Sequence, residues 1–245
     1  MKEENEPYLV QEFFGGETGY FVEVGANHPH NGSQSWHLEK LGWSGILIEP
    51  NPELVGKLRE NRRAKVFAVA CSSRENDGRK LPFYVAGPLS TLDRAAMAPG
   101  AQPKTIIEVP ARTLNSILTE AGAPQPIDFL SIDVEGHEIA VLRDFDFIRW
   151  QPRLILLEDH VGNLRKHRLM KSYRYRLVRR SGHNGWYVPK NTQIHFGLID
   201  RWRVLRKYYL ALPFRMLRNQ SRRLRQPIKD RMAANESRSK SGRVA

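Results

Sequence analysis

The chain has 245 residues, of which 40% are hydrophobic, and its 39 Lys or Arg outnumber its 26 Asp or Glu. This length suits one large domain, and no apolar run of about 18 residues is present to predict a transmembrane helix. The single cysteine, Cys71, excludes an internal disulfide, and the acidic segment 1–6 has no apolar core like that of a secretory signal. We therefore expect a cytoplasmic protein.

The net charge of +13 is concentrated near one end of the sequence. Residues 201–245 contain 14 basic and 2 acidic residues, which leaves 25 basic and 24 acidic residues in 1–200. A strongly basic protein is often a nucleic-acid binder. That argument applies here only to the tail.

Strands and helices are predicted to alternate over the first 70 residues. Buried-type apolar runs predict strands at 20–24, 46–48 and 66–70. Helical periodicity predicts a helix at 33–41, and Pro52 opens a second helix after the next strand. This alternation is typical of a parallel sheet covered by helices.

The second half continues the pattern. Strands are expected at 81–85, 127–132, 154–157 and in a hairpin of 175–178 with 186–188, and helices at 114–121, after the cap residue Thr113, and at 135–145. Residues 86–105 hold three prolines and no clear element, and a loop of that length is often functional. We expect this loop and the region after His160 to shape an acceptor pocket.

Polar residues stand at the C-terminal ends of four predicted strands. They are Glu23 with Gly25, Glu49, Asp133 with Glu135, and Glu158 with His160. In open parallel sheets, ligands bind outside those ends. Each position alone is equally well explained as a solvated strand end or a helix cap, but the four together predict one shared crevice.

The first turn separates two classes of nucleotide ligand. Asn27 and His30 take the places of the second and third glycines of a G-x-G-x-x-G turn, which a pyrophosphate requires. Glu49 is placed to accept hydrogen bonds from both hydroxyls of a ribose. Because Glu23 would repel a pyrophosphate but suits a sulfonium, these residues favour S-adenosylmethionine over NAD.

Several blocks of the sequence resemble the FkbM-type methyltransferases. They are residues 21–33, 36–52 (W-H-L-E-K-L-G-W-S-G-I-L-I-E-P-N-P), 90–92 (S-T-L), 110–114 (P-A-R-T-L) and 128–138 (D-F-L-S-I-D-V-E-G-H-E). The similarity covers roughly residues 8–190. It implies an α/β class I methyltransferase (Rossmann-like) fold, with a seven-stranded, mostly parallel sheet whose last strand is antiparallel. It also implies S-adenosylmethionine as the donor and O-methylation of a sugar, glycolipid or natural-product acceptor.

The resemblance also implies roles for single residues. Glu23, Gly25 and Asn27 would line the methionine side with Ser33 nearby, Glu49 would hold the ribose, Cys71 and Ser72 would border the adenine, and Asp133 would face the donor's amino group or the acceptor. The sequence departs from the family at His28-Pro29-His30 and at Asn115, where Asp is common. We interpret Asn115 as a helix-surface difference.

A hydroxyl acceptor needs a general base. His137 is our first candidate, and Glu135, Glu158 and His160 are the others; a purely structural hydrogen bond is the alternative for either histidine. Asp133, Glu158 and Asp159 could instead hold a magnesium ion, which prefers oxygen ligands. Cys71 and the histidines lack zinc-site spacing, and Cys71 is not expected to be a nucleophile.

The basic tail divides the chain into a predicted methyltransferase domain at 1–197 and an extension at 198–245. Leu198, Trp202, Leu205, Tyr209 and Leu212 share one helix face, with arginines mostly elsewhere. Such a helix either contacts a membrane surface or packs this stripe on the domain. Residues 219–245 lack an apolar pattern and are expected to be disordered.

Two other functions stay open. A nucleic-acid methyltransferase would use the tail to follow phosphates, although we regard nucleic acid as the less favoured partner. A non-catalytic module would keep the donor pocket and modify nothing. The sequence identifies neither the acceptor nor the oligomeric state.

Overall fold

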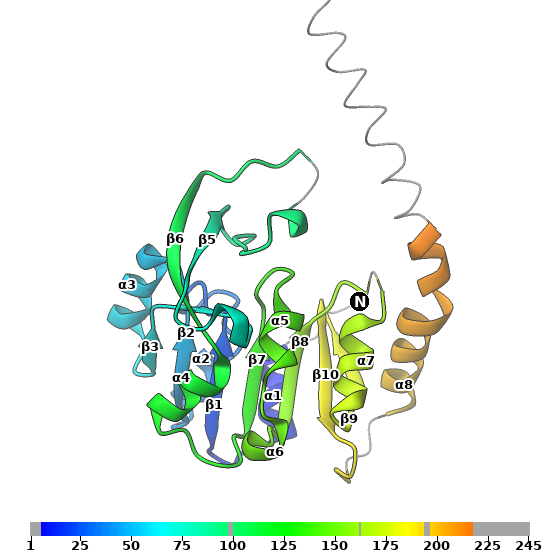
Figure 1. The fold of residues 1–245 in the computed structure, drawn as a ribbon. Coiled ribbons are helices and arrows are strands. Elements are labelled where there is room, and N and C mark those ends of the chain that lie inside the picture. The colour runs from blue at the N-terminus through cyan, green and yellow to red at the C-terminus, as the bar shows by residue number, and fades with distance from the viewer. Residues whose placement is uncertain (1–5, 98–99, 162, 194–196, 218–245) are drawn as a thin grey trace, which may run out of the picture.

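The computed structural model describes residues 6–97, 100–161, 163–193 and 197–217. Its main sheet has seven strands and carries helices on both faces (Figure 1). In spatial order the strands are β3 (Lys65–Phe67), β2 (Ser44–Ile48), β1 (Tyr20–Val24), β7 (Phe129–Ile132), β8 (Leu154–Glu158), β10 (Asn184–Pro189) and β9 (Tyr175–Ser181). The helices are α1 (Glu6–Phe13), α2 (Trp36–Lys40), α3 (Pro52–Asn61), α4 (Leu114–Ala121), α5 (Glu138–Arg143), α6 (Phe147–Trp150), α7 (Arg165–Ser172) and α8 (Leu198–Leu205).

The strand directions confirm the predicted class I arrangement. Strands β3, β2, β1, β7 and β8 pair in parallel, and β10 lies antiparallel between β8 and β9. The carboxyl ends of β1, β2, β7 and β8 therefore meet at one edge of the sheet. The four polar strand ends lie together there, as the prediction of one shared crevice needs.

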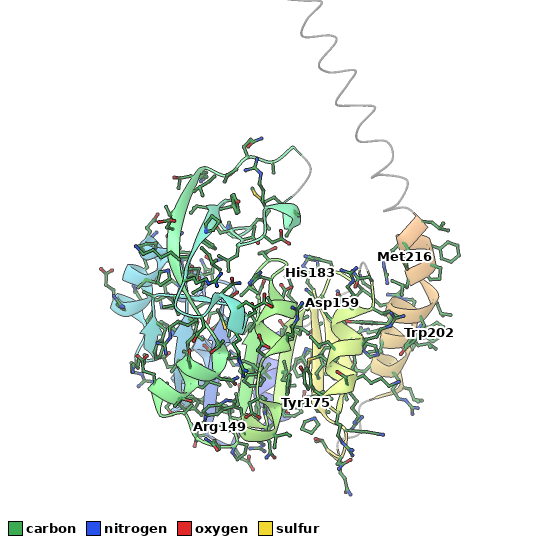
Figure 2. The ribbon with its side chains drawn as sticks, in the orientation of Figure 1. Arg149, Asp159, Tyr175, His183, Trp202 and Met216 are labelled. Carbon is green, nitrogen blue, oxygen red and sulfur yellow. The ribbon has the colours of Figure 1, made fainter. Side chains whose placement is uncertain are left out.

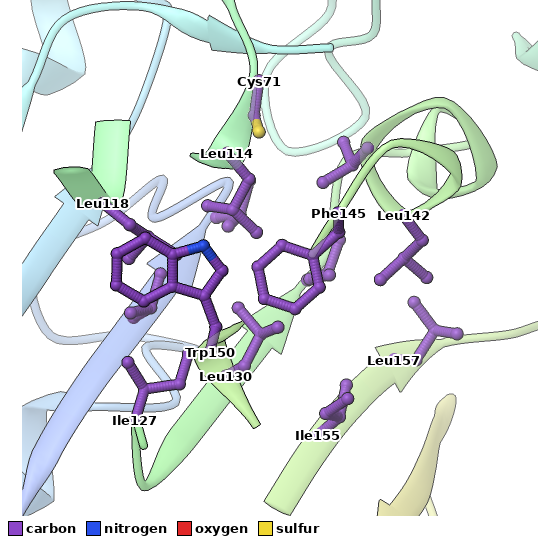
Figure 3. Close-up of a cluster of buried hydrophobic side chains, with 14 of the residues drawn as sticks. Cys71, Leu114, Leu118, Ile127, Leu130, Leu142, Phe145, Trp150, Ile155 and Leu157 are labelled. Carbon is purple, nitrogen blue, oxygen red and sulfur yellow. The ribbon is translucent and has the colours of Figure 1, made fainter. Parts of the chain in front are cut away.

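Alternating strand residues build two apolar layers. Val22 and Val24 pack with α4 to α7, whereas Phe21 packs with α1 to α3 on the opposite face. Figure 3 shows part of the first layer, in which Trp150 and Phe145 lie among aliphatic side chains of α4 and the sheet. The sheet is thus buried on both faces, as parallel sheets require.

A second sheet rises above the carboxyl edge of the first (Figure 1). It consists of β4 (Ala70–Cys71), β6 (Thr105–Arg112) and β5 (Lys80–Val85) in that order. The predicted strand at 66–70 was therefore wrong in extent, because the chain leaves the main sheet after Phe67 and enters the second sheet at Ala70. Strand β6 was missed because Pro110 interrupts its β-branched pattern.

Two predicted helices begin later than expected. Helix α2 starts at Trp36 because the preceding serines turn toward Glu23. Helix α5 starts at Glu138 because Glu135 (φ 49°) and Gly136 (φ 102°) adopt left-handed backbone conformations. Helix α7 was missed because its sequence, RKHRLMKS, is mostly polar.

Asn115 is a structural link rather than a surface difference, so that interpretation was wrong. Its Oδ1 accepts hydrogen bonds from the Trp150 indole Nε1 at 3.0 Å and the Asp146 amide at 3.0 Å, and its Nδ2 donates to the Asp144 carbonyl at 2.7 Å. An aspartate could accept both bonds but could not donate the third.

The C-terminal segment 198–217 continues α8 through a π-helical stretch, Arg206–Leu210, into a helical turn at 212–217. Of the predicted stripe, only Leu212 is buried; Leu198, Trp202, Leu205 and Tyr209 are exposed, which contradicts the alternative in which this stripe packs on the domain. Tyr208 and Leu212 pack on Val161 instead.

The segment predicted to be disordered, 219–245, lies outside the described residues, as does residue 218. None of the described helices is both long enough and apolar enough to span a bilayer.

Candidate active site

The turn after β1, residues 25–27, brings three strands together. The amides of Gly25 and Ala26 both donate to the Ile48 carbonyl, at 2.9 and 3.2 Å. Gly25 has φ 82°, and a Cβ there would lie 1.8 Å from the carbonyl oxygen of Asp133 at the end of β7. Any other residue would force β1 and β7 apart, which explains the glycine.

Glu49, at the end of β2, is held by backbone amides. Its Oε2 accepts from the Asn27 amide at 2.9 Å and its Oε1 from the Asn51 amide at 2.8 Å. Asn27 has φ 50°, a conformation that asparagine tolerates better than most residues. Burial raises the pKa of Glu49, and each oxygen keeps a second lone pair for a ligand hydroxyl.

A cavity joins this turn to the end of β7. Its lining includes five of the residues that the sequence analysis assigned to a donor site: Gly25, Asn27, Glu49, Cys71 and Asp133. Its apolar wall includes Leu54, Val69 and Phe83, and the loop after β5 contributes Gly87, Pro88, Ser90 and Leu92. Among the described residues that line the cavity, three are acidic, namely Glu49, Asp133 and Glu135, and none is Lys, Arg or His. The cavity thus suits a cation and disfavours a phosphate.

The structure places Glu23 and Ser33 behind the turn rather than in the cavity. The Glu23 carboxylate accepts from Ser33 Oγ at 2.9 Å, from the Gln34 amide at 2.7 Å and from Ser35 Oγ. Burial raises the pKa of Glu23 despite these bonds and the nearby Arg62. The prediction that Glu23 faces the ligand was therefore wrong: Glu23 holds the segment after the turn, and Glu49, Asp133 and Glu135 supply the cavity's negative charge.

Arg62, which the sequence analysis missed, ties these segments together. Its fully buried guanidinium donates to the Pro29 carbonyl (3.1 Å), to Ser33 and Ser35 Oγ (3.1 and 2.8 Å) and to Glu39 Oε2 (2.7 Å). The unusual His28-Pro29-His30 stretch closes on itself, because His28 Nδ1 accepts from the amides of His30 and Asn31. A hydrogen bond spanning more than 20 residues leaves no local signal in a sequence.

The first base candidate, His137, turns away from the cavity. Its Nε2 lies 2.8 Å from Ser72 Oγ, which also accepts from Asn76. Burial lowers the pKa of His137. Ser72 does not line the cavity either, although the adjacent Cys71 does. This geometry matches the structural alternative for His137.

Four carboxyl groups gather at one end of the cavity, and we call Asp133, Glu135, Glu138 and Glu158 the acid cluster; Asp133 and Glu135 line the cavity, and the other two do not. Lys166 of α7 reaches into it, with its Nζ 2.7 Å from Glu138 Oε2 and 2.6 Å from the Glu158 carbonyl. The turn that carries Glu135 is fixed from above by Thr91, whose hydroxyl donates to the Glu135 carbonyl at 2.8 Å. Lys166 and Thr91 were both missed, because each contacts a segment more than seven residues away along the chain.

The acid cluster binds protons more tightly than free carboxyls do. Burial and the neighbouring carboxylates raise the pKa of Glu135 to about 7 and that of Glu158 to about 9. Burial and Glu138 raise the pKa of Asp133 to about 6. Lys166 opposes burial at Glu138 and lowers its pKa. At neutral pH, Glu158 is therefore protonated, whereas Glu135 can accept and release a proton.

Of the three predicted magnesium ligands, Asp133 and Glu158 come together in the acid cluster, but Asp159 does not join them. The Asp159 carboxylate faces away, accepting from the Val161 amide at 2.7 Å and from the Tyr208 hydroxyl at 2.9 Å. His160 instead lies with Nε2 3.0 Å from Glu158 Oε1, and its ring centroid lies 4.8 Å from that of His183, with the two ring planes tilted by 58°. Figure 2 labels Asp159 and His183 at this end of the sheet. Single ligand atoms of Glu135, Glu158 and His160 lie within 4.8 Å of one another, a group that could hold an ion.

Cys71 is buried beside the cavity, and burial raises its pKa well above the ordinary value. A thiol in this state is a poor nucleophile. The expectation that Cys71 is not catalytic is consistent with this environment.

Comparisons with known proteins point to one family. A family model described as "Methyltransferase FkbM domain" matches residues 23–177. No curated protein matches significantly. Among solved structures, the chain is similar to monomeric WbdD, with 13% identity, a TM-score of 0.44 and coverage of 78% of this chain. The chain spans 41% of the length of that WbdD chain.

Proposed function

The chain belongs to the family of FkbM methyltransferase domains, and from this premise we propose that it transfers a methyl group from S-adenosylmethionine to a hydroxyl of a sugar, glycolipid or natural product. The observation that carries the proposal is a cavity whose charged lining is wholly acidic among the described residues and which opens beside a carboxyl with a pKa of about 7.

The cavity fits the donor in three respects. Glu49 offers free lone pairs at the strand end where a ribose binds in such folds. Leu54, Val69 and Phe83 offer an apolar wall for a planar base. Asp133 and Glu135 offer negative charge to a group carrying ammonium and sulfonium cations, and no lining base is present among the described residues for a pyrophosphate.

When bound, S-adenosylmethionine supplies a methyl group on a cationic sulfur, so the protein has mainly to align the acceptor and remove its proton. Glu135 lines the cavity and can be deprotonated near neutral pH, so we assign it the role of general base. Glu158 does not line the cavity, and because it holds its proton at that pH it adds no negative charge beside Glu135. His160 is the second candidate for the base, through its contact with Glu158.

The other two functions receive less support. The acids that line the cavity, Glu49, Asp133 and Glu135, oppose the approach of a phosphodiester chain, which disfavours a nucleic-acid acceptor. A non-catalytic module has no need of a carboxyl held near neutral pKa in a cavity, a feature that marks catalytic sites more often than binding sites.

The donor assignment is tested by replacing Glu49. Glu49→Ala removes two acceptor oxygens, and loss of hydrogen bonds to a charged group costs about 1.5–3 kcal/mol. We expect S-adenosylmethionine to bind about 10- to 150-fold more weakly in isothermal titration calorimetry. Glu53→Ala is the control, since its exposed carboxylate lies four residues away and pairs with Lys57.

The wild-type protein should bind S-adenosylmethionine and its demethylated product but not NAD. Equal donor affinity in Glu49→Ala and Glu53→Ala, or preferential binding of NAD by the wild type, would refute the assignment. Turnover of the donor with panels of sugars and glycolipids then tests the acceptor class, and transfer only to an amine or a thiol would contradict O-methylation.

A further inference from the structure

The outer side of the segment 198–217 is apolar, and we propose that it binds the surface of a membrane that contains anionic lipid. This outer face is defined by nine exposed side chains: Leu198, Ile199, Trp202, Leu205, Tyr209, Leu210, Phe214, Met216 and Leu217. Figure 2 labels Trp202 and Met216 on the side of the segment that points away from the domain. Nine exposed apolar side chains within one helical segment of 20 residues are more than the single exposed residues that need no explanation, and they indicate an interaction site.

The inner side of the segment is fixed, so the outer face cannot turn inward. Tyr208 is fully buried and donates to Asp159 Oδ2 at 2.9 Å, and Arg215 Nε donates to the Val161 carbonyl at 3.2 Å. Arg179 of β9 donates twice to the Asp200 carboxylate, at 3.1 and 3.0 Å. Phe214 and Leu198 remain 74% and 80% exposed as a consequence.

The charge around the outer face selects its partner. Within 197–217 the single acid, Asp200, is buried against Arg179, while the segment carries five basic residues, and Arg201 and Arg206 are exposed. Two copies of this face would bring like charges together, whereas anionic headgroups would neutralise them. Trp202 and Tyr209 are residues favoured at the headgroup level. The combination matches an interfacial amphipathic helix.

This inference is independent of the proposed function, because the outer face does not overlap the cavity and no methyl donor is needed to test it. The full chain is sedimented with vesicles of phosphatidylcholine alone or of phosphatidylcholine with phosphatidylglycerol at 3:1. We expect binding to the anionic vesicles, together with a blue shift of tryptophan fluorescence. Binding should weaken at least tenfold between low and high salt.

The decisive variant is the triple change Leu198→Ser, Trp202→Ser and Phe214→Ser, which leaves the buried contacts and every basic residue in place. It should lower the affinity for anionic vesicles at least tenfold. The matched control is Ile106→Ser with Ile148→Ser, two residues that are 52% and 86% exposed elsewhere on the domain. Circular dichroism and thermal unfolding establish that both variants are folded.

Each outcome decides the question. Binding by the triple variant equal to that of the control would show that basic charge alone attracts the vesicles and would overturn the proposal. So would a wild type that ignores all vesicles but forms a dimer in light scattering, with the triple variant monomeric, since the occupant would then be a second copy. Loss of vesicle binding confined to the triple variant supports the proposal.

Discussion

The buried carboxyl groups at the two ends of the proposed site have different surroundings. At the proposed donor end, Glu49 in the cavity and Glu23 behind the turn accept hydrogen bonds from serine hydroxyls and backbone amides. At the acceptor end, the acid cluster contains four carboxyls and a single lysine, Lys166. Hydrogen bonds fix the positions of the carboxylates at the first end, whereas Asp133 and Glu135 at the second end have pKa values of about 6 and 7.

The difference shows how one sheet edge supports both binding and chemistry. Carboxylates that receive several hydrogen bonds stay in place and present their remaining lone pairs to a ligand. Carboxyls crowded by like charge acquire raised pKa values, which a general base requires. Substitutions at each end should therefore have different consequences.

The largest effect is expected at the acceptor end. Glu135→Gln should lower kcat about 10²- to 10⁴-fold, while the affinity for S-adenosylmethionine stays within a few-fold of the wild-type value. Because the pKa of Glu135 is about 7 and its deprotonated form is the base, wild-type activity should rise with pH up to about 7 and then level off. Steady-state kinetics from pH 5 to 9 measure both quantities.

Glu75→Gln, at an exposed site in the turn after β4, serves as the control for the same assay. If Glu135→Gln kept the wild-type rate and pH profile, another group such as His160 would have to be the base.

The next effect should appear at the donor end as lost stability. Arg62→Ala leaves buried Glu39 and Glu23 without their guanidinium partner, and breaking a buried ion pair costs about 3–5 kcal/mol. Urea unfolding should report this decrease in the free energy of unfolding. Arg59→Ala, one turn earlier on the exposed side of α3, should change it by less than about 0.5 kcal/mol. Similar values for the two variants would mean that Arg62 does not hold the donor end together.

A further effect should appear in the pH dependence of Tm. The folded protein raises the pKa of Glu158 to about 9, so it binds this proton more tightly than the unfolded chain does. The resulting stabilisation is complete below the unfolded pKa of about 4.3 and is lost as pH rises toward 9. Glu158→Gln keeps a neutral side chain at every pH and should become more stable relative to the wild type across that range.

Differential scanning calorimetry at several pH values tests this expectation, with the exposed Glu60→Gln as the control. A constant difference in Tm between the wild type and Glu158→Gln from pH 5 to 9 would show that the folded state does not raise this pKa.

The parts of the fold that could be predicted are those coded by local pattern. Apolar runs predicted β1, β2, β7 and β8. Glu49 and the turn after β1 lie at the carboxyl edge of the sheet, as expected from the strand order. Side chains alternate between the two faces of a strand, and this alternation along β1 also indicates on which face Glu23 lies. Because Phe21 faces the α1–α3 layer, Glu23 must face the same side, away from the helices that pack on Val22 and Val24.

The rest depends on contacts between distant segments. Arg62 reaches residues 23 to 33 positions away, and Lys166 joins α7 to the start of α5, so neither role is visible in a local window. The direction of Asp159 depends on Tyr208, 49 residues later. Protonation in the acid cluster likewise arises only when burial brings Asp133, Glu135 and Glu158 together.

The backbone conformation of Val161 depends on contacts with the C-terminal segment. This buried, β-branched residue has φ 51°, a conformation rare for its type and one that surrounding contacts must enforce. Tyr208 and Arg215 provide those contacts on either side of His160, at Asp159 and at the Val161 carbonyl. A chain shortened to residue 197 would lose both of these contacts. The C-terminal segment thus fixes the backbone on both sides of His160, the second candidate for the general base.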